Sequence, residues 1–366
     1  MARNKLIRTP QKYVQGYHVL LNFYQETQEL GNRYLFVCSK SGYNACYEQL
    51  EKSFDESTAY RHYEIFSGRS SNEEITRMCD LVREHQINIV TAVGGGSAID
   101  TAKVAALFCH IPIVIIPTIS ATDAPCTGDA VVYHADGNFD RYEFLPQNPN
   151  AIIVDTDIIA HAPARFLVAG MGDALATYFE TRICYHTDGP SVEGGGVSRA
   201  AYTLSKLCYE TLLQYGVQAL HSCERQLVTP ALEAIIEANT YLSGVGSDNG
   251  GLAVAHSVYN GFTILEDCTS MHGEVVAFGV ITQLLLEGAP QEELHTVINF
   301  CYDVGLPVTL KDMGLTASSE LMNACEKACA DGETIHNMPG DITPQQLYDA
   351  LLLADILGTE KKKGVL

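Results

Sequence analysis

The first 160 residues alternate between short runs of β-branched and aromatic residues and longer amphipathic segments. The short runs predict strands, and apolar positions three or four residues apart predict helices. Strands are expected at residues 34–38, 62–66, 87–93, 112–116 and 151–154, and helices at residues 44–54 and 73–85. Strands that alternate with helices are typical of a parallel sheet with helices on its faces.

After Pro163 the pattern changes to long segments rich in alanine, leucine and glutamate, with few strand-like runs. Helices are expected at residues 164–183, 198–215, 230–242, 275–286 and 344–357. Pro163 and Pro230 suit the first turns of the helices that follow them. We therefore predict an α/β N-terminal domain with a parallel sheet, residues 1–160, followed by an all-helical C-terminal domain, residues 161–366.

One predicted strand, residues 87–93, is followed at once by three glycines and then by Ser97, where a helical pattern begins. Glycine lets a ligand come close to the backbone, and the first N–H groups of a helix have no partner within it. This arrangement predicts a phosphate or pyrophosphate site. The alternative is a tight turn with Ser97 as the helix cap and Asp100 completing a capping box. We favour phosphate binding because three glycines exceed what such a turn needs.

Composition and charge narrow the class of protein. The chain has 366 residues and a formal net charge of −21, which argues against a general basic surface for nucleic acid. It has no apolar run of the roughly 20 residues that a membrane helix needs and no signal-peptide-like start. Its twelve cysteines form no C-x-x-C pair, as is typical of reduced, mostly buried thiols. We expect a soluble, cytoplasmic protein with no nucleic-acid or membrane partner.

Two histidines lie among small residues, His256 in GGLAVAHSVYNG and His272 in SMHGEVVAFG. Imidazole is a common metal ligand, but their separation fits no short zinc motif, and a single such histidine is more often a hydrogen-bonded core residue. Asp173, in AGMGDALATYFE, is a third candidate because a buried charge needs a partner. Its local sequence favours the alternative of a first-turn aspartate stabilised by the helix dipole.

The segment at residues 117–128, PTISATDAPCTG, follows a predicted strand and is rich in small hydroxyl residues. Ligands bind beyond the carboxyl ends of strands in open α/β sheets. Asp123 is therefore a candidate to accept a hydrogen bond from a substrate hydroxyl. An Asx-turn before Pro125 explains the same aspartate equally well.

Together these segments resemble the glycerol dehydrogenases, in the metal-dependent (iron-containing type) alcohol dehydrogenase superfamily, over nearly the whole chain. The resemblance is carried by GGGSAIDTAK (94–103), PTISATDAPC (117–126), FDRYEFLPQNPNAIIVDT (139–156), PARFLVAGMGDALATYFE (163–180), TPALEAIIEANTYLSGVG (229–246), GGLAVAHSVYNG (250–261), HGEVVAFG (272–279) and GETIHNMPG (332–340). It implies a nicotinamide-binding N-terminal domain, a helical metal-binding C-terminal domain and an active site in the cleft between them.

The resemblance also assigns roles to individual residues. Asp173, His256 and His272 would hold one divalent metal ion, commonly zinc. Asp123 matches the aspartate that contacts substrate hydroxyl groups and is the expected catalytic residue. The positions implied for the dinucleotide are Gly94, Gly95, Gly96 and Ser97 at the pyrophosphate, with Thr118, Thr127, Asp129 and Tyr133 lining the rest. The implied reaction is the NAD-linked oxidation of glycerol to dihydroxyacetone, or its reverse, in a homo-oligomer.

Three positions depart from the family pattern. Ser39, followed by Lys40, stands where the family has an aspartate that reads the adenosine ribose. Serine and lysine can accept a 2′-phosphate that a carboxylate would repel, so we expect a weaker preference for NAD and acceptance of NADP. Asp129 places a carboxylate near the nicotinamide, and Tyr259 replaces a histidine of the second metal-site motif. These two departures bear on the substrate more than on the reaction class.

Three other functions are weighed against this one. A dehydrogenase for another 1,2-diol or a hydroxycarboxylate is the closest alternative. A lyase of the dehydroquinate synthase type shares fold, NAD and metal, but it needs several cationic residues and a glutamate ligand, where this chain has Asp173. A non-catalytic nucleotide-binding or structural protein would need no metal, and the intact candidate ligands count against it.

Overall fold

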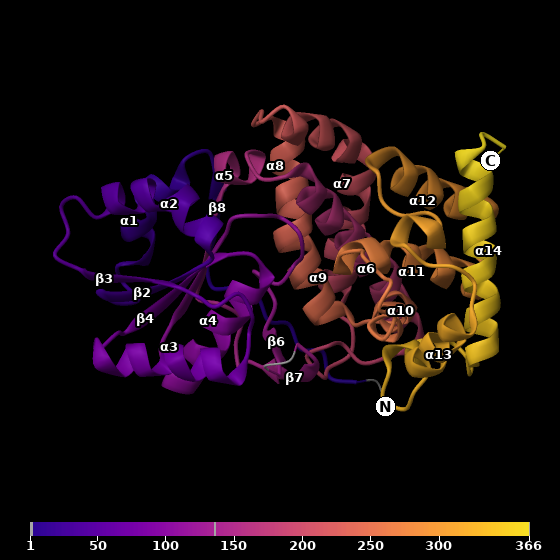
Figure 1. Ribbon diagram of the computed structural model, residues 1–366, viewed down its shortest axis with the longest axis horizontal. Coiled ribbons are helices and arrows are strands. Elements are labelled where there is room, and N and C mark those ends of the chain that lie inside the picture. Colours follow the sequence, from indigo (N-terminus) through magenta and orange to yellow (C-terminus); the bar gives the residue numbers. More distant parts are fainter. Residues whose placement is uncertain (1–2, 135–136, 366) are drawn as a thin grey trace. The chain divides into compact units, whose positions relative to one another are not determined.

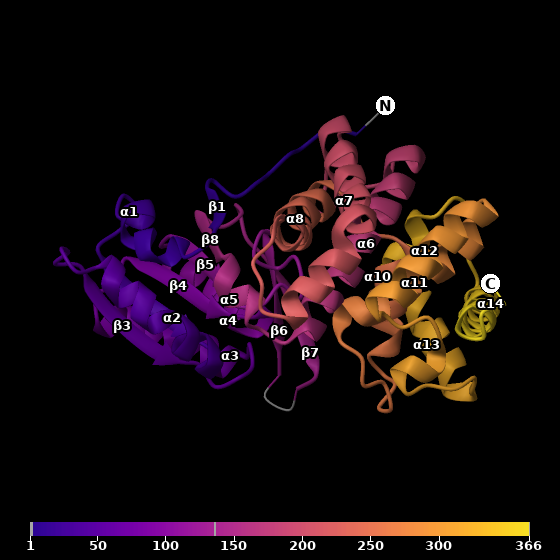
Figure 2. The ribbon, with the colours of Figure 1, turned by 90° about the horizontal axis from the view of Figure 1, so that it is seen from above.

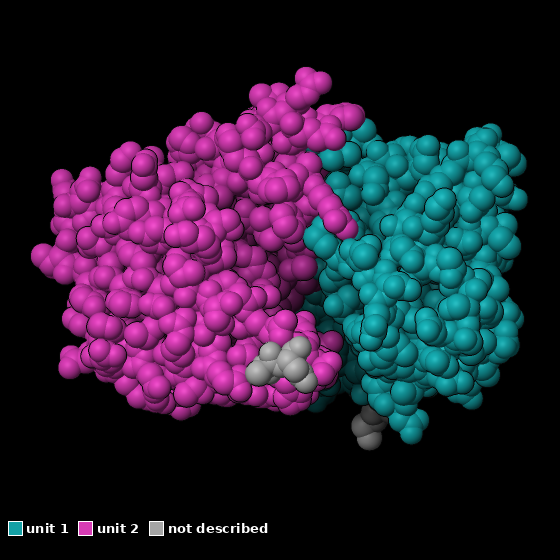
Figure 3. Space-filling model, viewed as in Figure 1, with its two compact units in different colours: residues 1–7, 167–220, 245–366 teal, residues 8–166, 221–244 magenta. Residues whose placement is uncertain are grey.

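The chain forms two compact units, which Figure 3 colours separately. The computed structural model describes residues 3–134 and 137–365. The sheet unit comprises residues 8–166 and 221–244, and the helical unit comprises residues 1–7, 167–220 and 245–366. We predicted that residues 1–160 bind the dinucleotide and that residues 161–366 bind the metal ion. That assignment of binding roles stays a prediction.

The sheet unit is built on a six-stranded parallel sheet in the order β1-β8-β5-β4-β2-β3, which can be followed in Figure 2. Its strands are β1 (Tyr13–Gly16), β2 (Arg33–Cys38), β3 (Tyr60–Ile65), β4 (Ile89–Gly94), β5 (Ile113–Pro117) and β8 (Ala151–Asp155). The central strands β4, β5 and β8 are buried along their whole length. Such continuous burial is expected of parallel strands covered on both faces.

Helices cover both faces of this sheet (Figure 1). They are η1 (Val19–Asn22), α1 (Phe23–Thr27), α2 (Lys40–Ser53), α3 (Asn72–Glu84), α4 (Gly96–Cys109) and α5 (Thr156–Ala160). Helices η1, α1 and α2 contact one another on one face, and α3 and α4 pack together on the other. Later in the chain, α8 (Pro230–Glu237) and the π-helical turn η2 (Ala238–Leu242) also belong to this unit, with α8 against α5.

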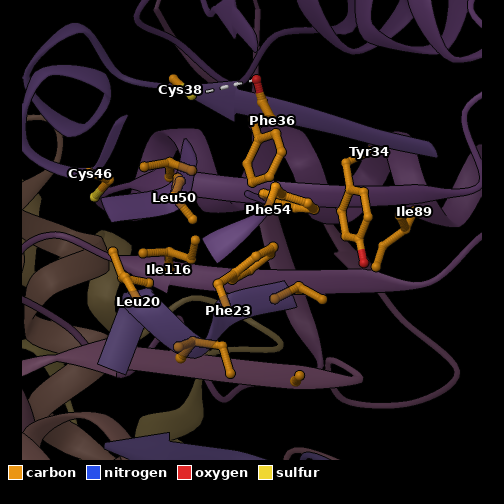
Figure 4. Close-up of a cluster of buried hydrophobic side chains, with 14 of the residues drawn as sticks. Leu20, Phe23, Tyr34, Phe36, Cys38, Cys46, Leu50, Phe54, Ile89 and Ile116 are labelled. Carbon is orange, nitrogen blue, oxygen red and sulfur yellow. Dashed lines mark hydrogen bonds between the residues drawn. The ribbon is translucent and has the colours of Figure 1, made fainter. Parts of the chain in front are cut away.

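An aromatic cluster fills the space between β2 and the helices on the first face. The rings of Phe23, Phe36 and Phe54 lie with centroids 5.6–6.3 Å apart, and Tyr34 packs beside them (Figure 4). Alternate residues of β2 point to this side because side chains alternate across a strand. Aromatic pairs at these distances stabilise the core by about 0.5–1.5 kcal/mol each beyond the area they bury.

The direction in which successive strands are added to the sheet reverses between β2 and β4. The connection after β2 leads outward to the edge strand β3, and the connection after β3 returns to β4 on the other side of β2. This strand order creates a topological switch point, and in open α/β sheets ligands bind beyond the carboxyl ends of the strands at such a point. The glycine turn follows β4 and Ser39 follows β2, so both lie at the switch point.

A hairpin completes the sheet unit. Strands β6 (Asp129–Tyr133) and β7 (Phe139–Phe144) pair antiparallel, and β6 contacts α4. The segment between β5 and β6 therefore passes over α4 before the hairpin begins. It contains the loop at residues 117–128 that the sequence singled out.

The helical unit is organised around α11 (His272–Glu287), which is buried from Gly273 to Leu284. The other helices that lie mostly in this unit are α6 (Ala164–Thr187), α7 (Arg199–Glu224), α9 (Ser243–Gly250), α10 (Val254–Phe262), α12 (Gln291–Val304), η3 (Leu310–Met313), α13 (Ser319–Ala328), η4 (Thr334–Asn337) and α14 (Pro344–Lys362). Helices α10, α12 and α14 pack against α11. A helix enclosed by others must be apolar nearly all round, as the sequence of α11 is.

The predicted fold class is confirmed, with a parallel sheet in the N-terminal region and helices after Pro163. The twelve cysteines are free and most of them are buried, as their scattered spacing predicted. Among the described residues, no helix combines the length and the apolar character that crossing a membrane requires.

Candidate metal centre and cofactor turn

Three helices of the helical unit bring together the predicted metal ligands Asp173 on α6, His256 on α10 and His272 on α11. One potential ligand atom from each lies within 4.8 Å of the others. The Asp173 Oδ1 atom is 3.2 Å from Nε2 of His272 and 3.7 Å from Nε2 of His256. Within the described residues, no other group of three or more histidine, cysteine or acidic side chains converges in this way.

Glycines beside the ligands allow the three helices to approach at backbone distance. A Cβ on Gly172, next to Asp173, would overlap the carbonyl oxygen of Gly273, and a Cβ on Gly273, next to His272, would overlap a carbonyl oxygen of α6. A Cβ on Gly279 would lie 2.8 Å from backbone atoms of α10. The spacing of the ligands therefore depends on residues that have no side chain.

Asp173 lies nine residues beyond the start of α6 at Ala164, so its interpretation as a first-turn aspartate is wrong. Its side chain is only 3% exposed, against 17% for His256 and 30% for His272. Burial raises the pKa of Asp173, but the two imidazoles outweigh it and hold that pKa below its usual range. The cluster is thus anchored on a buried carboxylate and opens to solvent on the side of His272.

A second buried carboxylate, Glu180, contacts the ring nitrogen of His256 that faces away from Asp173. Its Oε2 atom is 2.5 Å from Nδ1 of His256, and its Oε1 atom accepts the backbone N–H groups of Ala253 and His256 at 2.8 and 3.0 Å. Burial lowers the pKa of His256, but Glu180 and Asp173 outweigh it and raise that pKa well above its usual value. Glu180 caps the start of α10 and directs Nε2 of His256 toward Asp173.

This donor set fits a divalent metal ion. Two imidazole nitrogens and one carboxylate oxygen are ligands that zinc accepts, and three protein ligands leave a coordination position for a substrate. A carboxylate hydrogen-bonded behind a ligating histidine is the arrangement that fixes its tautomer and ring orientation. Tyr259 packs edge-on against the His272 ring, with centroids 4.2 Å apart, and so forms part of the wall beside the cluster.

The glycine turn in the sheet unit leaves room for a ligand. Helix α4 begins at Gly96 with Gly95 as its N-cap and without a side-chain cap, so Ser97 is not the cap and that alternative is wrong. A Cβ on Gly94 would lie 3.0 Å from Ser39 Oγ, and one on Gly95 would lie 2.7 Å from Ile119. A Cβ on Gly96 would meet no atom within 4 Å beyond its chain neighbours and the backbone of its own helix. Packing thus explains the first two glycines and leaves open space at the third, which fits a pyrophosphate at the helix start.

The other predicted cofactor residues also belong to the sheet unit. Ser39 donates its backbone N–H to Val93 at 2.9 Å, and Thr118 donates its own to Gly94 at 3.0 Å, so both flank the glycine turn. Thr127 and Asp129 follow along the chain at the end of the loop and the start of β6. Tyr133 ends β6, and burial together with the nearby Asp100 raises its pKa.

Asp123 lies in the same loop and is partly buried. Its Oδ2 atom accepts a hydrogen bond from the Ser243 hydroxyl at 3.0 Å, and its carbonyl accepts the N–H of Cys126 at 2.9 Å. The second bond shows that a turn does form before Cys126. The first fixes the orientation of the carboxylate, so Asp123 is held ready to accept a further hydrogen bond.

Sequence reasoning missed Glu180 and Lys103, although each is a charged residue inside an otherwise apolar helix. Glu180 follows Asp173 by seven residues, which places both on one face of α6. Lys103 has no exposed surface and donates to carbonyl oxygens of the loop before β6. A buried charge needs a compensating partner, and that rule, applied to every such position, identifies both residues.

Comparison with known proteins identifies the family of this chain. Residues 10–156 match the family model described as iron-containing alcohol dehydrogenase. The chain is 46% identical to a glycerol dehydrogenase of Escherichia coli, over 97% of this chain and 98% of that protein, and 46% identical to one of Thermotoga maritima, over 96% and 97%. The crystal structure of a Schizosaccharomyces pombe glycerol dehydrogenase superposes with a TM-score of 0.95 at 33% identity, covering 100% of this chain and 94% of that one. The chain belongs to the iron-containing alcohol dehydrogenase family.

The Glu180→Gln variant should bind zinc about 10–100-fold more weakly than the unchanged protein. The amide can place an N–H donor against Nδ1 of His256, which would put the proton of the imidazole on Nε2, the atom that faces the metal site. Titration of the metal-free protein with zinc in a calorimeter measures this change.

The matched control is Glu287→Gln, which removes a partly buried acid at the far end of α11, where it pairs with Arg182. This variant should keep the zinc affinity of the unchanged protein. Equal zinc affinity in Glu180→Gln and in the unchanged protein would contradict the role given to Glu180.

Proposed function

We propose that this protein oxidises glycerol to dihydroxyacetone, or catalyses the reverse reaction, with a nicotinamide dinucleotide and one divalent metal ion, which we expect to be zinc. The observation that carries the proposal is the convergence of Asp173, His256 and His272 on three packed helices. The glycerol dehydrogenases among the relatives support the choice of substrate. The proposal includes a cytoplasmic location, which the composition of the chain predicts, and assembly into a homo-oligomer, which rests on the family resemblance alone.

The residues of the helical unit would bind the metal ion and leave one side of it open to the alcohol. A divalent ion supplies the Lewis acidity that favours loss of the alcohol proton. Asp173 and His256 would hold it from the buried side, and Glu180 keeps the His256 ring in place. His272, the most exposed of the three ligands, marks the side from which a small polyol can enter.

The residues of the sheet unit would bind and orient the dinucleotide, whose oxidised nicotinamide accepts the hydride from carbon. The open space at Gly96 and the N–H groups at the very start of α4 suit the pyrophosphate. Thr118, Thr127, Asp129 and Tyr133 are proposed to line the remainder of the cofactor. Asp123, oriented by Ser243, is proposed to accept a hydrogen bond from a substrate hydroxyl.

The experiment that tests the proposed function follows the absorbance of reduced nicotinamide during incubation with glycerol. We expect turnover that is abolished when the metal is removed by a chelator and restored when zinc is returned. The His272→Ala variant should lose at least about 100-fold in rate, because two remaining ligands hold the ion poorly. Turnover that survives chelation would contradict metal dependence. No turnover with glycerol, 1,2-propanediol or dihydroxyacetone would contradict the proposed substrate class.

The Gly96→Ala variant separates cofactor binding from folding. Its Cβ meets no atom beyond its chain neighbours and its own helix, and alanine favours a helix by about 1 kcal/mol over glycine. The melting temperature should therefore stay the same or rise, whereas the KM for NAD should rise at least tenfold because the methyl group enters the space assigned to the pyrophosphate. An unchanged KM would show that the cofactor does not approach α4 at this residue.

The Ser39→Asp variant tests the choice between NAD and NADP. Ser39 is the N-cap of α2 and its hydroxyl accepts the N–H of Gly42 at 3.0 Å, a role that aspartate also performs. The new carboxylate should raise the ratio of kcat/KM for NAD to that for NADP at least tenfold, because it repels a 2′-phosphate. The same substitution at another N-cap, Ser318→Asp on α13, should leave the ratio unchanged. An unchanged ratio in Ser39→Asp would place the adenosine ribose elsewhere.

A further inference from the structure

Lys103 is a charged residue of the glycine-turn motif that binding of the pyrophosphate does not explain. Its side chain has no exposed surface. Its ammonium group donates to the carbonyl oxygens of Ala124 at 2.6 Å, Thr127 at 2.8 Å and Asp129 at 2.8 Å. An ammonium group has three N–H donors, so three inward-facing carbonyls match its capacity.

These contacts hold in place the segment that the family resemblance assigns to the cofactor. Thr127 and Asp129 are two of the proposed cofactor residues, and the Thr127 hydroxyl lies a further 3.2 Å from the ammonium nitrogen. Without the lysine, one buried and two partly buried carbonyl oxygens would lose their ammonium donor, and native structures rarely leave buried polar groups unpaired. Asp100, one turn earlier on α4, lies near enough for the ammonium group to lower the pKa of its carboxyl group, against the larger effect of burial.

Lys103 and Gly96 stand on the same helix. They are seven residues apart, which is two turns of α4 and places them on one side of it, about 10 Å apart along the axis. Gly96 begins the helix at the proposed pyrophosphate position, and Lys103 ties the loop to the same helix two turns later. One rigid element therefore sets the spacing between the turn and the loop.

We propose that Lys103 is a positioning residue for the dinucleotide, which fixes the segment at residues 124–129 at a set distance from the glycine turn. This inference rests on the proposed function, because it assumes that the segment contacts the cofactor. Lys103 does not touch the cofactor or the substrate in this account. Its effect passes through the three carbonyl oxygens that it holds.

The Lys103→Met variant keeps the length of the side chain and removes the ammonium group. Calorimetric titration with NADH should give a Kd at least tenfold above that of the unchanged protein, whereas zinc affinity, which reports on the helical unit, should stay within twofold. Hydrogen–deuterium exchange should show lost protection in residues 124–129 and retained protection in β2, β4 and β5. The control Lys12→Met, at an exposed lysine of the sheet unit, should change none of these values.

A role in folding alone would give a different result. Loop and strands would then lose protection together, and the NADH affinity of the molecules that remain folded would match that of the unchanged protein. A folded Lys103→Met variant with an unchanged Kd for NADH would overturn the inference. Failure of the unchanged protein to bind NADH would overturn the proposed function and this inference with it, so the two failures are distinguishable.

If Lys103→Met does not fold, Lys103→Gln takes its place, since its amide can still donate two hydrogen bonds. We expect a Kd for NADH at least threefold above that of the unchanged protein, with loss of protection confined to residues 124–129. An unchanged Kd together with lost loop protection would overturn the inference, because the loop would then not position the cofactor.

Discussion

The helical unit depends on how it accommodates two carboxylates buried in one apolar helix. Asp173 and Glu180 lie on the same face of α6 with almost no solvent exposure. Isolated buried charges of this kind are too costly for a fold to keep. His256 lies between them, with Nε2 toward Asp173 and Nδ1 toward Glu180. The start of α10 adds two backbone N–H groups, and a divalent ion would complete the neutralisation.

The sheet unit also buries a charge inside an apolar helix, but there the charge is positive. Lys103 is buried in α4, and carbonyl oxygens of the loop compensate its charge. Burial raises the pKa of Asp100 to about 7, although Lys103 lowers it, so this carboxyl group tolerates its position partly by holding a proton. In each unit, a charged residue inside an apolar helix lies beside residues that are proposed to bind a ligand.

Most of the strands of the sheet could be predicted from the sequence. The elements that were not predicted lack a clear hydrophobic pattern. The buried strands of the sheet are short continuous runs of apolar residues, so their positions were predicted to within about two residues. Strand β1 is only four residues long and half-buried, and the hairpin of β6 and β7 carries exposed aromatic residues, so neither gave a clear pattern. The helix expected at residues 230–242 is interrupted by the π-helical turn η2, which local spacing does not reveal.

The site illustrates the same division between local and tertiary information. The three metal ligands were predicted from their family motifs, but their convergence depends on close approaches at Gly172 and Gly273 that only the packed helices show. Glu180 was missed because its partner, His256, lies 76 residues away in the sequence. Local sequence identified candidate chemistry, and the tertiary fold determined which candidates meet.

We expect Asp173, His256 and His272 to hold one divalent ion. A crystal structure of the zinc-loaded protein, with anomalous scattering measured at the zinc edge, tests it most directly. One strong peak per chain is expected, about 2.0–2.2 Å from an oxygen of Asp173 and from Nε2 of both histidines, with Nδ1 of His256 still on Glu180. A peak at other residues, or no peak between these three side chains, would contradict it.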